Sequence, residues 1–347
     1  MNLENLGADD GVRHLFNLHA AQGLELGRVC FASHEQYTVY LESGLCEATA
    51  AGRLRWDETL PAVGDWVAAR RVGESFALIE EVLPRRTQFS RAAAGTSVRE
   101  QVIAANIDLA IVVCGLDHDY NLRRIERYLV LASESKADVM IVLNKADLCM
   151  ELEERLAAVR EIAGGAEVLP LCARQDVEAL RTFVRGKTVA LLGSSGAGKS
   201  TIANGLLGVM LQATAEVREH DSRGRHTTTS RMLAVLPGGG ALIDNPGMRE
   251  LQMWASECAL DDVFTEIARL AESCKFGDCT HTSEPNCAVK EALERDELDQ
   301  RRWESYLKLQ GEMRYQARQQ DVHAMLEHKK KWKAIHKAMR RNGKDLR

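Results

Sequence analysis

The sequence predicts a multidomain protein: a small β-barrel, a doubly wound parallel α/β domain, and a helical C-terminal region around a metal site. Short strands separated by Gly, Ser and Pro predict the barrel within residues 27–82. Strands and helices then alternate from residue 109 onward, which is typical of a parallel sheet with helices on both faces. A Cys/His cluster at residues 274–287 interrupts the helical pattern of the last part. A chain of 347 residues is long enough for two or three such domains.

The first predicted domain is the barrel. No long 3.6-residue period runs through its strands, and turn residues separate them. Five strands within about sixty residues favour an OB-fold, a barrel that commonly binds oligonucleotides. A barrel that serves only for packing fits the same pattern, because fold does not fix function. The expected strands are Gly27–Ala32, Tyr37–Glu42, Leu45–Ala50, Gly64–Arg71 and Phe76–Val82.

The second predicted domain follows after residue 108. Ligands bind doubly wound sheets beyond the carboxyl ends of the strands, so we expect its site at that edge. The expected strands are Leu109–Cys114, Asp138–Leu143, Glu167–Leu171 and Lys187–Leu192. The expected helices are Leu122–Lys136, Glu151–Ala163, Val177–Val184 and one that begins at Lys199.

A phosphate-binding loop follows the last of these strands. Residues 193–200 match the G-x-x-x-x-G-K-[ST] pattern in full, between an apolar strand and a helix. Backbone N–H groups of such a loop wrap phosphates, and the helix N-terminus adds a favourable dipole. We expect Lys199 to reach the β- and γ-phosphates and the Ser200 hydroxyl to bind Mg²⁺. The predicted residues are Gly193, Ser194, Ser195, Gly196, Ala197, Gly198, Lys199, Ser200 and Thr201.

A base-reading motif, Asn144-Lys145-Ala146-Asp147, follows an earlier strand. The Asp147 carboxylate can accept hydrogen bonds from guanine N1–H and N2–H₂ together, and adenine lacks this donor pair, so the motif predicts GTP rather than ATP. The tetrapeptide alone is a weak signal, and the P-loop strengthens it. Cys172 and Ala173 fit the loop that contacts guanine through backbone N–H groups, a match that depends on its neighbours.

The order of these motifs indicates a circular permutation. In an ordinary GTPase the P-loop precedes the base-reading motif, whereas here it comes about fifty residues later. Joined natural termini and a new cut beside the switch region explain the reversal. Folding tolerates such a cut because domain termini often lie close together at the surface.

A Mg²⁺ and γ-phosphate segment is expected downstream. Residues 244–247 end a strand in Asp-Asn-Pro-Gly, where Asp244 can hold the Mg²⁺ shell and the Gly247 N–H can contact the γ-phosphate. A Pro-Gly turn without function is the alternative interpretation. The run of threonines at 227–229 offers a Mg²⁺ ligand in a mobile switch, which we assign to Thr228 with Thr229 as the alternative.

The water-orienting group is not fixed by the motifs. Many GTPases carry a Gln after the glycine of this segment, but Met248 occupies that position, and a thioether cannot orient a water. His226 in the switch can act near neutral pH, and a histidine that packs or contacts RNA fits the sequence equally well. The predicted catalytic residues are therefore His226, Lys199 and Thr228.

One structural zinc ion is expected near the C-terminus. Cys274, Cys279, His281 and Cys287 supply three sulfurs and one imidazole within fourteen residues, a closed tetrahedral set. Turn-forming residues lie between the ligands, as a zinc knuckle requires. Such a site stabilises a small segment that lacks its own core. The other cysteines lack this spacing and are expected to be thiols.

Charge and hydropathy indicate a cytoplasmic protein with a polyanionic partner. No basic and apolar leader begins the sequence, and the longest apolar runs are too short to span a bilayer. The net charge is −5, yet residues 329–347 hold nine Lys or Arg and one acid. This tail favours nucleic acid, with a solvated helix end as the alternative.

Together these motifs resemble the ribosome small-subunit-dependent GTPase A family. The resemblance covers residues 27–289, including Gly64–Val67 in the barrel and Pro84–Thr87 at its exit. It implies an OB-fold, a circularly permuted GTPase domain and a zinc-binding domain. It further implies GTP hydrolysis stimulated by the small ribosomal subunit and a role late in that subunit's maturation through contact with its rRNA. We expect a monomer.

The predicted domains are a lead-in over residues 1–24, the OB-fold over 25–88, the permuted GTPase domain over 100–258, the zinc-binding helical domain over 259–325 and the basic tail over 326–347. Two other function classes remain open. One is an rRNA-binding nucleotide switch with negligible turnover, and the other is a P-loop ATPase or kinase, which Asp147 disfavours.

Overall fold

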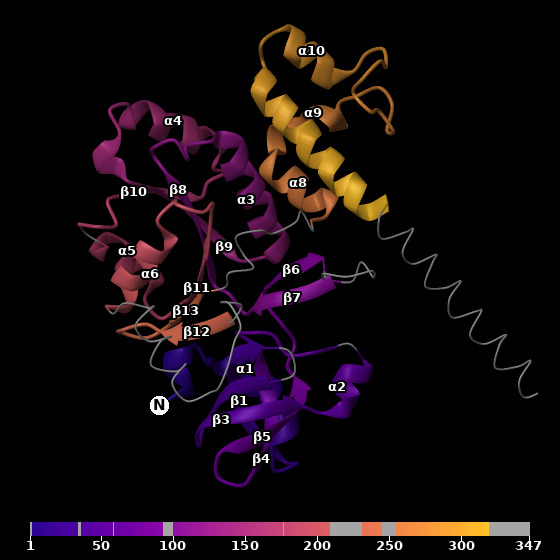
Figure 1. The fold of residues 1–347 in the computed structure, drawn as a ribbon. Helices are drawn as coiled ribbons and strands as arrows, with labels where there is room; N and C mark the ends of the chain where they lie inside the picture. The colour runs from indigo at the N-terminus through magenta and orange to yellow at the C-terminus, as the bar shows by residue number, and fades with distance from the viewer. Residues whose placement is uncertain are drawn as a thin grey trace, which may run out of the picture. The chain divides into compact units, whose positions relative to one another are not determined.

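The structure is a computed structural model that describes residues 2–33, 36–57, 59–92, 100–175, 177–208, 231–244 and 255–318 (Figure 1). Predictions for His226, Thr228, Gly247 and the basic tail lie outside these residues. The chain forms two compact units, Met1–Phe89 with Val102–Leu251 and Ser90–Gln101 with Gln252–Arg347. None of the described helices is both long and apolar enough to traverse a bilayer.

The N-terminal barrel has the five strands that the sequence predicts. They are β1 (Glu25–Ser33), β2 (Gln36–Leu41), β3 (Gly44–Ala50), β4 (Trp66–Val72) and β5 (Phe76–Val82). The strand order is β1-β2-β3-β5-β4, and β4 pairs back to β1 to close the barrel. Only β3 and β5 pair in parallel, and the other barrel pairings are antiparallel. Val29, Val39, Val67 and Ile79 fill the interior, consistent with the OB-fold expectation.

The nucleotide-binding half is built on a mainly parallel sheet. Its order is β10 (Glu167–Leu171), β9 (Asp138–Asn144), β8 (Leu109–Gly115), β11 (Thr188–Leu192), β13 (Ala241–Asp244) and β12 (Arg231–Val235). The first five strands are parallel, and β12 is antiparallel to β13. Strand β8 therefore lies between the strands that carry the two nucleotide motifs.

Helices cover both faces of this sheet, as a doubly wound fold requires (Figure 1). Ile111 and Val113 of β8 belong to an apolar cluster with α5 (Glu178–Val184) and α6 (Lys199–Leu207). The alternate residues Ala110 and Val112 are also fully buried, on the face where α3 (Leu122–Ser135) packs. The helix α4 (Leu152–Ile162) packs against α3 and β10.

The barrel and the nucleotide-binding half share one continuous sheet of eleven strands. The link is an antiparallel pairing of β1 with β12, in which Phe31 faces Met232. Because β1 also belongs to the barrel, backbone hydrogen bonds join the two halves directly. The sequence pattern contains no signal for this pairing.

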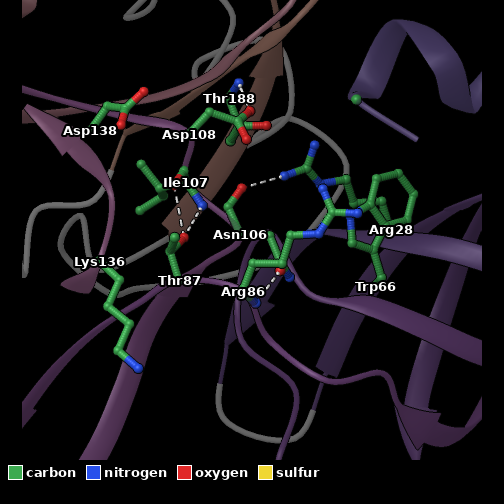
Figure 2. Close-up of a pocket in the computed structure, with 11 residues that line it drawn as sticks. Arg28, Trp66, Arg86, Thr87, Asn106, Ile107, Asp108, Lys136, Asp138 and Thr188 are labelled. Carbon is green, nitrogen blue, oxygen red and sulfur yellow. Dashed lines mark hydrogen bonds between the residues drawn. The ribbon is translucent and has the colours of Figure 1, made fainter. Parts of the chain in front are cut away.

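A buried arginine lies where the two halves meet (Figure 2). The pocket around it includes Asp108, Asp138 and Thr188 at the starts of β8, β9 and β11, and therefore lies at the opposite edge of the sheet from the P-loop. Arg28 of β1 donates to the carbonyls of Leu6, Gly64 (3.3 Å) and Asn106 (3.0 Å). Its guanidinium lies 4.8 Å from the ring centroid of Trp66. Burial lowers the pKa of Arg28 to about 10, so the side chain remains charged at neutral pH. The cation therefore depends on these carbonyls for compensation.

An ion pair stands beside this cation. Asp65 is buried and accepts from Arg85 at 2.8 Å with each of its carboxylate oxygens. Burial raises the pKa of Asp65, and the hydrogen bonds from Arg85 oppose the rise. Arg28, Trp66 and Asn106 also line a cavity of about 220 Å³ at this junction.

Several short elements have no counterpart in the expected pattern. They are η1 (Leu3–Leu6), α2 (Gly52–Trp56), β6 (Gln88–Ala92) and β7 (Glu100–Ala105), the last two forming a two-stranded sheet. The lead-in contains the helix α1 (Asp10–Ala20), where the Asp9 side chain accepts from Val12 N at 2.9 Å.

The described residues 255–318 of the second unit are mainly helical. Its helices are α8 (Glu257–Val263), α9 (Thr265–Glu272), α10 (Ala288–Glu294) and a helix over residues 300–318. Phe264, Trp303 and Tyr306 form an aromatic cluster, with Trp303 stacked on Tyr306 at a centroid distance of 5.5 Å. Arg302 donates to Glu266 (2.5 Å) and to the Val263 carbonyl (2.6 Å), which ties the last helix to α8 and α9.

We expect Gly64→Ala to destabilise the first unit strongly. Gly64 has φ +92°, and a Cβ there would lie 2.1 Å from the Ala105 carbonyl oxygen, so the barrel and the nucleotide-binding half would have to move apart. Backbone strain and overpacking together cost roughly 2–5 kcal/mol. Denaturant unfolding measures the loss.

Gly73→Ala is the matched control, because Gly73 also has positive φ (+75°) but nothing lies within 4 Å of its added Cβ. It should cost only about 1–2 kcal/mol. Equal losses in the two variants would contradict a tight contact at Gly64.

Candidate nucleotide and metal sites

The P-loop connects β11 to α6 at the carboxyl edge of the sheet. Gly198 has φ +100°, and a Cβ there would lie 2.0 Å from the Asn144 side-chain nitrogen. Only glycine fits this position, because it accommodates both the left-handed backbone and the close approach. The side chain of Asn144 in the base-reading motif therefore requires a glycine at position 198 of the P-loop.

The P-loop lysine lies over its own loop. Lys199 Nζ donates to the carbonyls of Gly193 (2.7 Å) and Ser194 (2.5 Å). Ser200 and Thr201, in the first turn of α6, are exposed. An ammonium group and a helix N-terminus lie together here, an arrangement that suits phosphate groups.

Asn144 brings three predicted segments together. It is buried at the end of β9, and its side-chain nitrogen donates to the Ala197 carbonyl at 2.9 Å. Its side-chain oxygen accepts from Ala173 N at 3.0 Å. One amide thus joins the base-reading motif, the P-loop and the segment at 172–173.

Lys145 makes a second link between the motifs. Its Nζ donates to the Gly196 carbonyl at 2.8 Å and to Asp117 Oδ2 at 2.6 Å. The backbone of Lys145 is left-handed, with φ 64°. Asp147, at the start of η2 (Ala146–Leu148), is exposed. A hydrogen bond with Asp147 raises the pKa of the Cys172 thiol, which places this thiol beside the base-reading carboxylate.

Two carboxylates at this edge, Asp117 and Asp119, were not among the residues predicted from the sequence. Both follow β8, and Asp119 Oδ1 accepts from the Ser194 hydroxyl of the P-loop at 2.5 Å. Asp117 contacts Lys145 as described above. In the sequence, the feature that could have identified them is their position just after a predicted strand, because ligands bind at the carboxyl ends of the strands in such sheets.

The remaining predicted nucleotide residues lie on β13, after it, or before β12 in the chain. That strand is parallel to β11 and ends at Asp244, so the Asp244 backbone reaches the same edge of the sheet as the P-loop. His226, Thr228 and Gly247 fall outside the described residues, so their placement is not tested.

The four predicted metal ligands lie together in the second unit. The ligand atoms of Cys274, Cys279, His281 and Cys287 all lie within 4.8 Å of one another. The Sγ atoms of Cys274 and Cys287 are 3.9 Å apart, and His281 Nδ1 lies 3.5 Å and 3.4 Å from them, respectively. A zinc tetrahedron with bonds of about 2.3 Å to sulfur and about 2.0 Å to nitrogen has edges of about 3.8 Å and 3.6 Å. The cluster therefore fits zinc.

The surroundings of the cluster orient its ligands. His281 (φ 59°) and Asn286 (φ 56°) form the turns between them. Trp303 packs edge-on against the His281 ring with a centroid distance of 6.0 Å. Burial lowers the pKa of His281, which favours the neutral imidazole that a metal requires.

Comparisons with known families agree with this geometry. The RsgA GTPase family model matches residues 82–254. A protein of Opitutus terrae named small ribosomal subunit biogenesis GTPase RsgA is 46% identical, and the alignment covers 98% of this chain and 97% of that protein. A protein of the same name from Leptospira interrogans is 44% identical, with 93% and 92% covered.

Two solved structures share the fold. The crystal structure of YjeQ from Thermotoga maritima has a TM-score of 0.63 at 27% identity, with 84% of this chain and 98% of that chain covered. YloQ, described as a circularly permuted GTPase, has a TM-score of 0.61 at 24% identity, with 84% and 95% covered, and supports the fold alone.

An ABC transporter family model also matches, over residues 180–345. This range contains β11, the P-loop and α6, which form a phosphate-binding unit common to P-loop proteins. It excludes the base-reading motif at 144–147. We attribute this match to the shared P-loop, because the relatives above align with nearly the whole chain.

We expect Cys287→Ser to remove the metal and unfold the segment around it. Cys287 is buried, and the serine hydroxyl is a poorer zinc ligand than a thiolate. Atomic absorption should find about one zinc per wild-type chain and less than about a tenth of that in the variant, with loss of helical circular dichroism.

Cys258→Ser is the control, because Cys258 is an exposed thiol on α8 of the same unit. It should keep both the zinc and the helicity. Full zinc in Cys287→Ser would show that the four side chains do not form the site.

Proposed function

The chain belongs to the RsgA GTPase family, and from this premise we propose that its GTP hydrolysis serves the biogenesis of the small ribosomal subunit. The protein is a GTP-hydrolysing enzyme. The observation that carries the proposal is the single amide of Asn144, which joins the P-loop to a guanine-reading motif that precedes it in the chain. Relatives that match nearly the full length carry the small-subunit name.

The guanine base is proposed to bind between residues 144–147 and 172–173. The exposed Asp147 carboxylate would exchange its contact with Cys172 for guanine N1–H and N2–H₂. Cys172 and Ala173 would line the base edge; because the Ala173 N–H already donates to Asn144 Oδ1, the Cys172 N–H would face the base. Selection of guanine over adenine would follow from the donor pair that adenine lacks.

The phosphates and Mg²⁺ are proposed to bind at the P-loop and the first turn of α6. Lys199 would leave the loop carbonyls for the β- and γ-phosphates. Ser200 is exposed there and would contribute a hydroxyl to Mg²⁺, together with Thr228. Asp244 would hold the outer shell of the ion, and Gly247 N–H would contact the γ-phosphate.

Hydrolysis is proposed to be slow until a partner completes the site. Met248 replaces the water-orienting glutamine, so His226 is our candidate for orienting the water. No arginine finger is identifiable in the sequence, and the small ribosomal subunit would supply the missing organisation.

The working cycle is a switch between bound and released states. GTP would order the segment at 226–229 and favour binding to rRNA, and hydrolysis would relax it and release the protein late in assembly. The barrel, the zinc-binding domain and the basic tail are the proposed rRNA contacts, with the domain limits set out above. The protein would act as a cytoplasmic monomer.

The first test is GTP turnover with and without purified small ribosomal subunits, with ATP as the competing substrate. We expect strong, GTP-selective stimulation and a loss of at least about a hundredfold in Lys199→Ala, because the ammonium stabilises the transferring phosphoryl group.

Tight GTP binding without stimulation would instead support an RNA-binding switch with negligible turnover. Equal turnover of ATP and GTP would indicate a P-loop ATPase. The first result would remove hydrolysis stimulated by the small ribosomal subunit, and the second would remove the selection of guanine by Asp147.

We expect His226→Ala to lower the stimulated rate by about a hundredfold while leaving the Kd for GTP within about twofold, because positioned proton transfer contributes on this scale. His14→Ala is the control, since His14 is exposed on α1 of the lead-in. Wild-type hydrolysis with full stimulation in His226→Ala would eliminate the catalytic role.

A further inference from the structure

The loop that follows β8 contacts both nucleotide motifs without belonging to either. We call residues 116–120 the brace loop. Leu116 N donates to the Asn144 carbonyl at 2.8 Å, and Arg155 of α4 donates to the Leu116 carbonyl at 2.9 Å. These backbone contacts fix the brace loop beside the end of β9.

Asp119 of the brace loop holds the P-loop. Its side chain is only 8% exposed, and Oδ1 accepts from the Ser194 hydroxyl at 2.5 Å. The same oxygen accepts from Arg124, while Oδ2 accepts from Gly115 N at 3.2 Å. Both carboxylate oxygens are thus occupied. A charged acceptor of this kind makes a stronger hydrogen bond than a neutral one.

Asp117 holds the base-reading motif in the same way. Its Oδ2 lies 2.6 Å from Lys145 Nζ, and its Oδ1 accepts from Asp119 N at 3.1 Å. Burial opposes ionisation, but the hydrogen bond from Lys145 prevails and lowers the pKa of Asp117 below its usual range. The carboxylate therefore stays charged and keeps the Lys145 ammonium near the Gly196 carbonyl.

The two carboxylates contact two motifs that are far apart from each other in the sequence. Ser194 and Lys145 are separated by about fifty residues, and their holders Asp119 and Asp117 are two residues apart. The Ser194 contact fixes the start of the P-loop, whose next residues present their N–H groups to phosphate. Contacts that hold a binding loop in its bound shape reduce the ordering cost of binding.

We propose that Asp117 and Asp119 are positioning residues that preorganise the guanine-nucleotide site without touching the nucleotide. The inference rests on the proposed nucleotide site and deepens it. Cations and N–H donors occupy the carboxylates already, so their role is to fix the P-loop and Lys145 relative to each other. Loss of either carboxylate then weakens GDP and GTP alike.

The test measures Kd for fluorescently labelled GDP and GTP in Asp119→Ala, Ser194→Ala and the double variant. Each single change should raise both Kd values about tenfold, the scale of one charge-assisted hydrogen bond. The double variant should bind no more than about twofold worse than Asp119→Ala, because both changes remove the same contact. Asp117→Asn should raise both values about fivefold through Lys145.

Further readouts separate positioning from simple folding. Intrinsic kcat at saturating GTP should stay within about threefold while KM rises, since binding of ground state and transition state weakens equally. Asp108→Ala is the matched control: Asp108 precedes the same strand at its other end and accepts from Thr188 N at 2.7 Å. It should leave both Kd values unchanged.

The outcomes that overturn the inference are distinct from failure of the proposed function. Wild-type affinity in Asp119→Ala, additive losses of about a hundredfold in the double variant, or the same loss in Asp108→Ala would remove it while leaving the GTPase assignment intact. Wild-type protein that binds no GDP would overturn both. Should Asp119→Ala fail to fold, Ser194→Ala tests the same contact, because Asp119 then keeps Arg124 and Gly115 as partners.

Discussion

The side chain of Asn144 is the contact on which the nucleotide site depends. It satisfies the Ala197 carbonyl on one side and the Ala173 N–H on the other, and it leaves room only for glycine at position 198. Replacing Asn144 with an apolar residue would leave the Ala197 carbonyl and the Ala173 N–H buried without hydrogen bonds. Each unsatisfied group would lower the free energy of unfolding by about 1–3 kcal/mol. The contact is indifferent to chain order, because it needs only that β9 and β11 end at the same edge. That is why a permuted chain can assemble an ordinary site.

The junction between the barrel and the nucleotide-binding half shows what keeps the permuted domain attached to its neighbour. A buried cation is costly unless polar partners surround it, and Arg28 finds carbonyls in the lead-in, in the barrel and just before β8. Removing any one of these segments leaves part of the guanidinium uncompensated. The shared contacts of Arg28 and the β1–β12 pairing therefore favour one cooperatively folding unit rather than two independently folding domains.

Local patterns in the sequence were sufficient to predict the five barrel strands, the strands of the parallel sheet and the cluster of four metal ligands, and to place the P-loop and the base-reading motif just after strands. Each of these is encoded by neighbouring residues: turn residues around strands, glycines in a loop, ligands within fourteen residues. What escaped prediction depends on distant partners. Arg28 looks like any strand arginine, and the pairing of Phe31 with Met232 joins segments about two hundred residues apart. The role of Asp119 is likewise visible only once Ser194 lies beside it.

The small hydrophobic core of the second unit explains why this unit would need a metal ion for stability. Helices α8, α9 and α10 have seven or eight residues each, too short to be stable alone. Few side chains there are fully buried, Phe264 and Ile267 among them. A tetrahedral ion adds cross-links where apolar burial is limited, and its binding energy becomes folding energy. Four protein ligands also leave no coordination position for a substrate, which separates this site from the chemistry at the P-loop. Zinc bound by this cluster would thus be a structural element of the second unit, while the P-loop and the base-reading motif lie in the first.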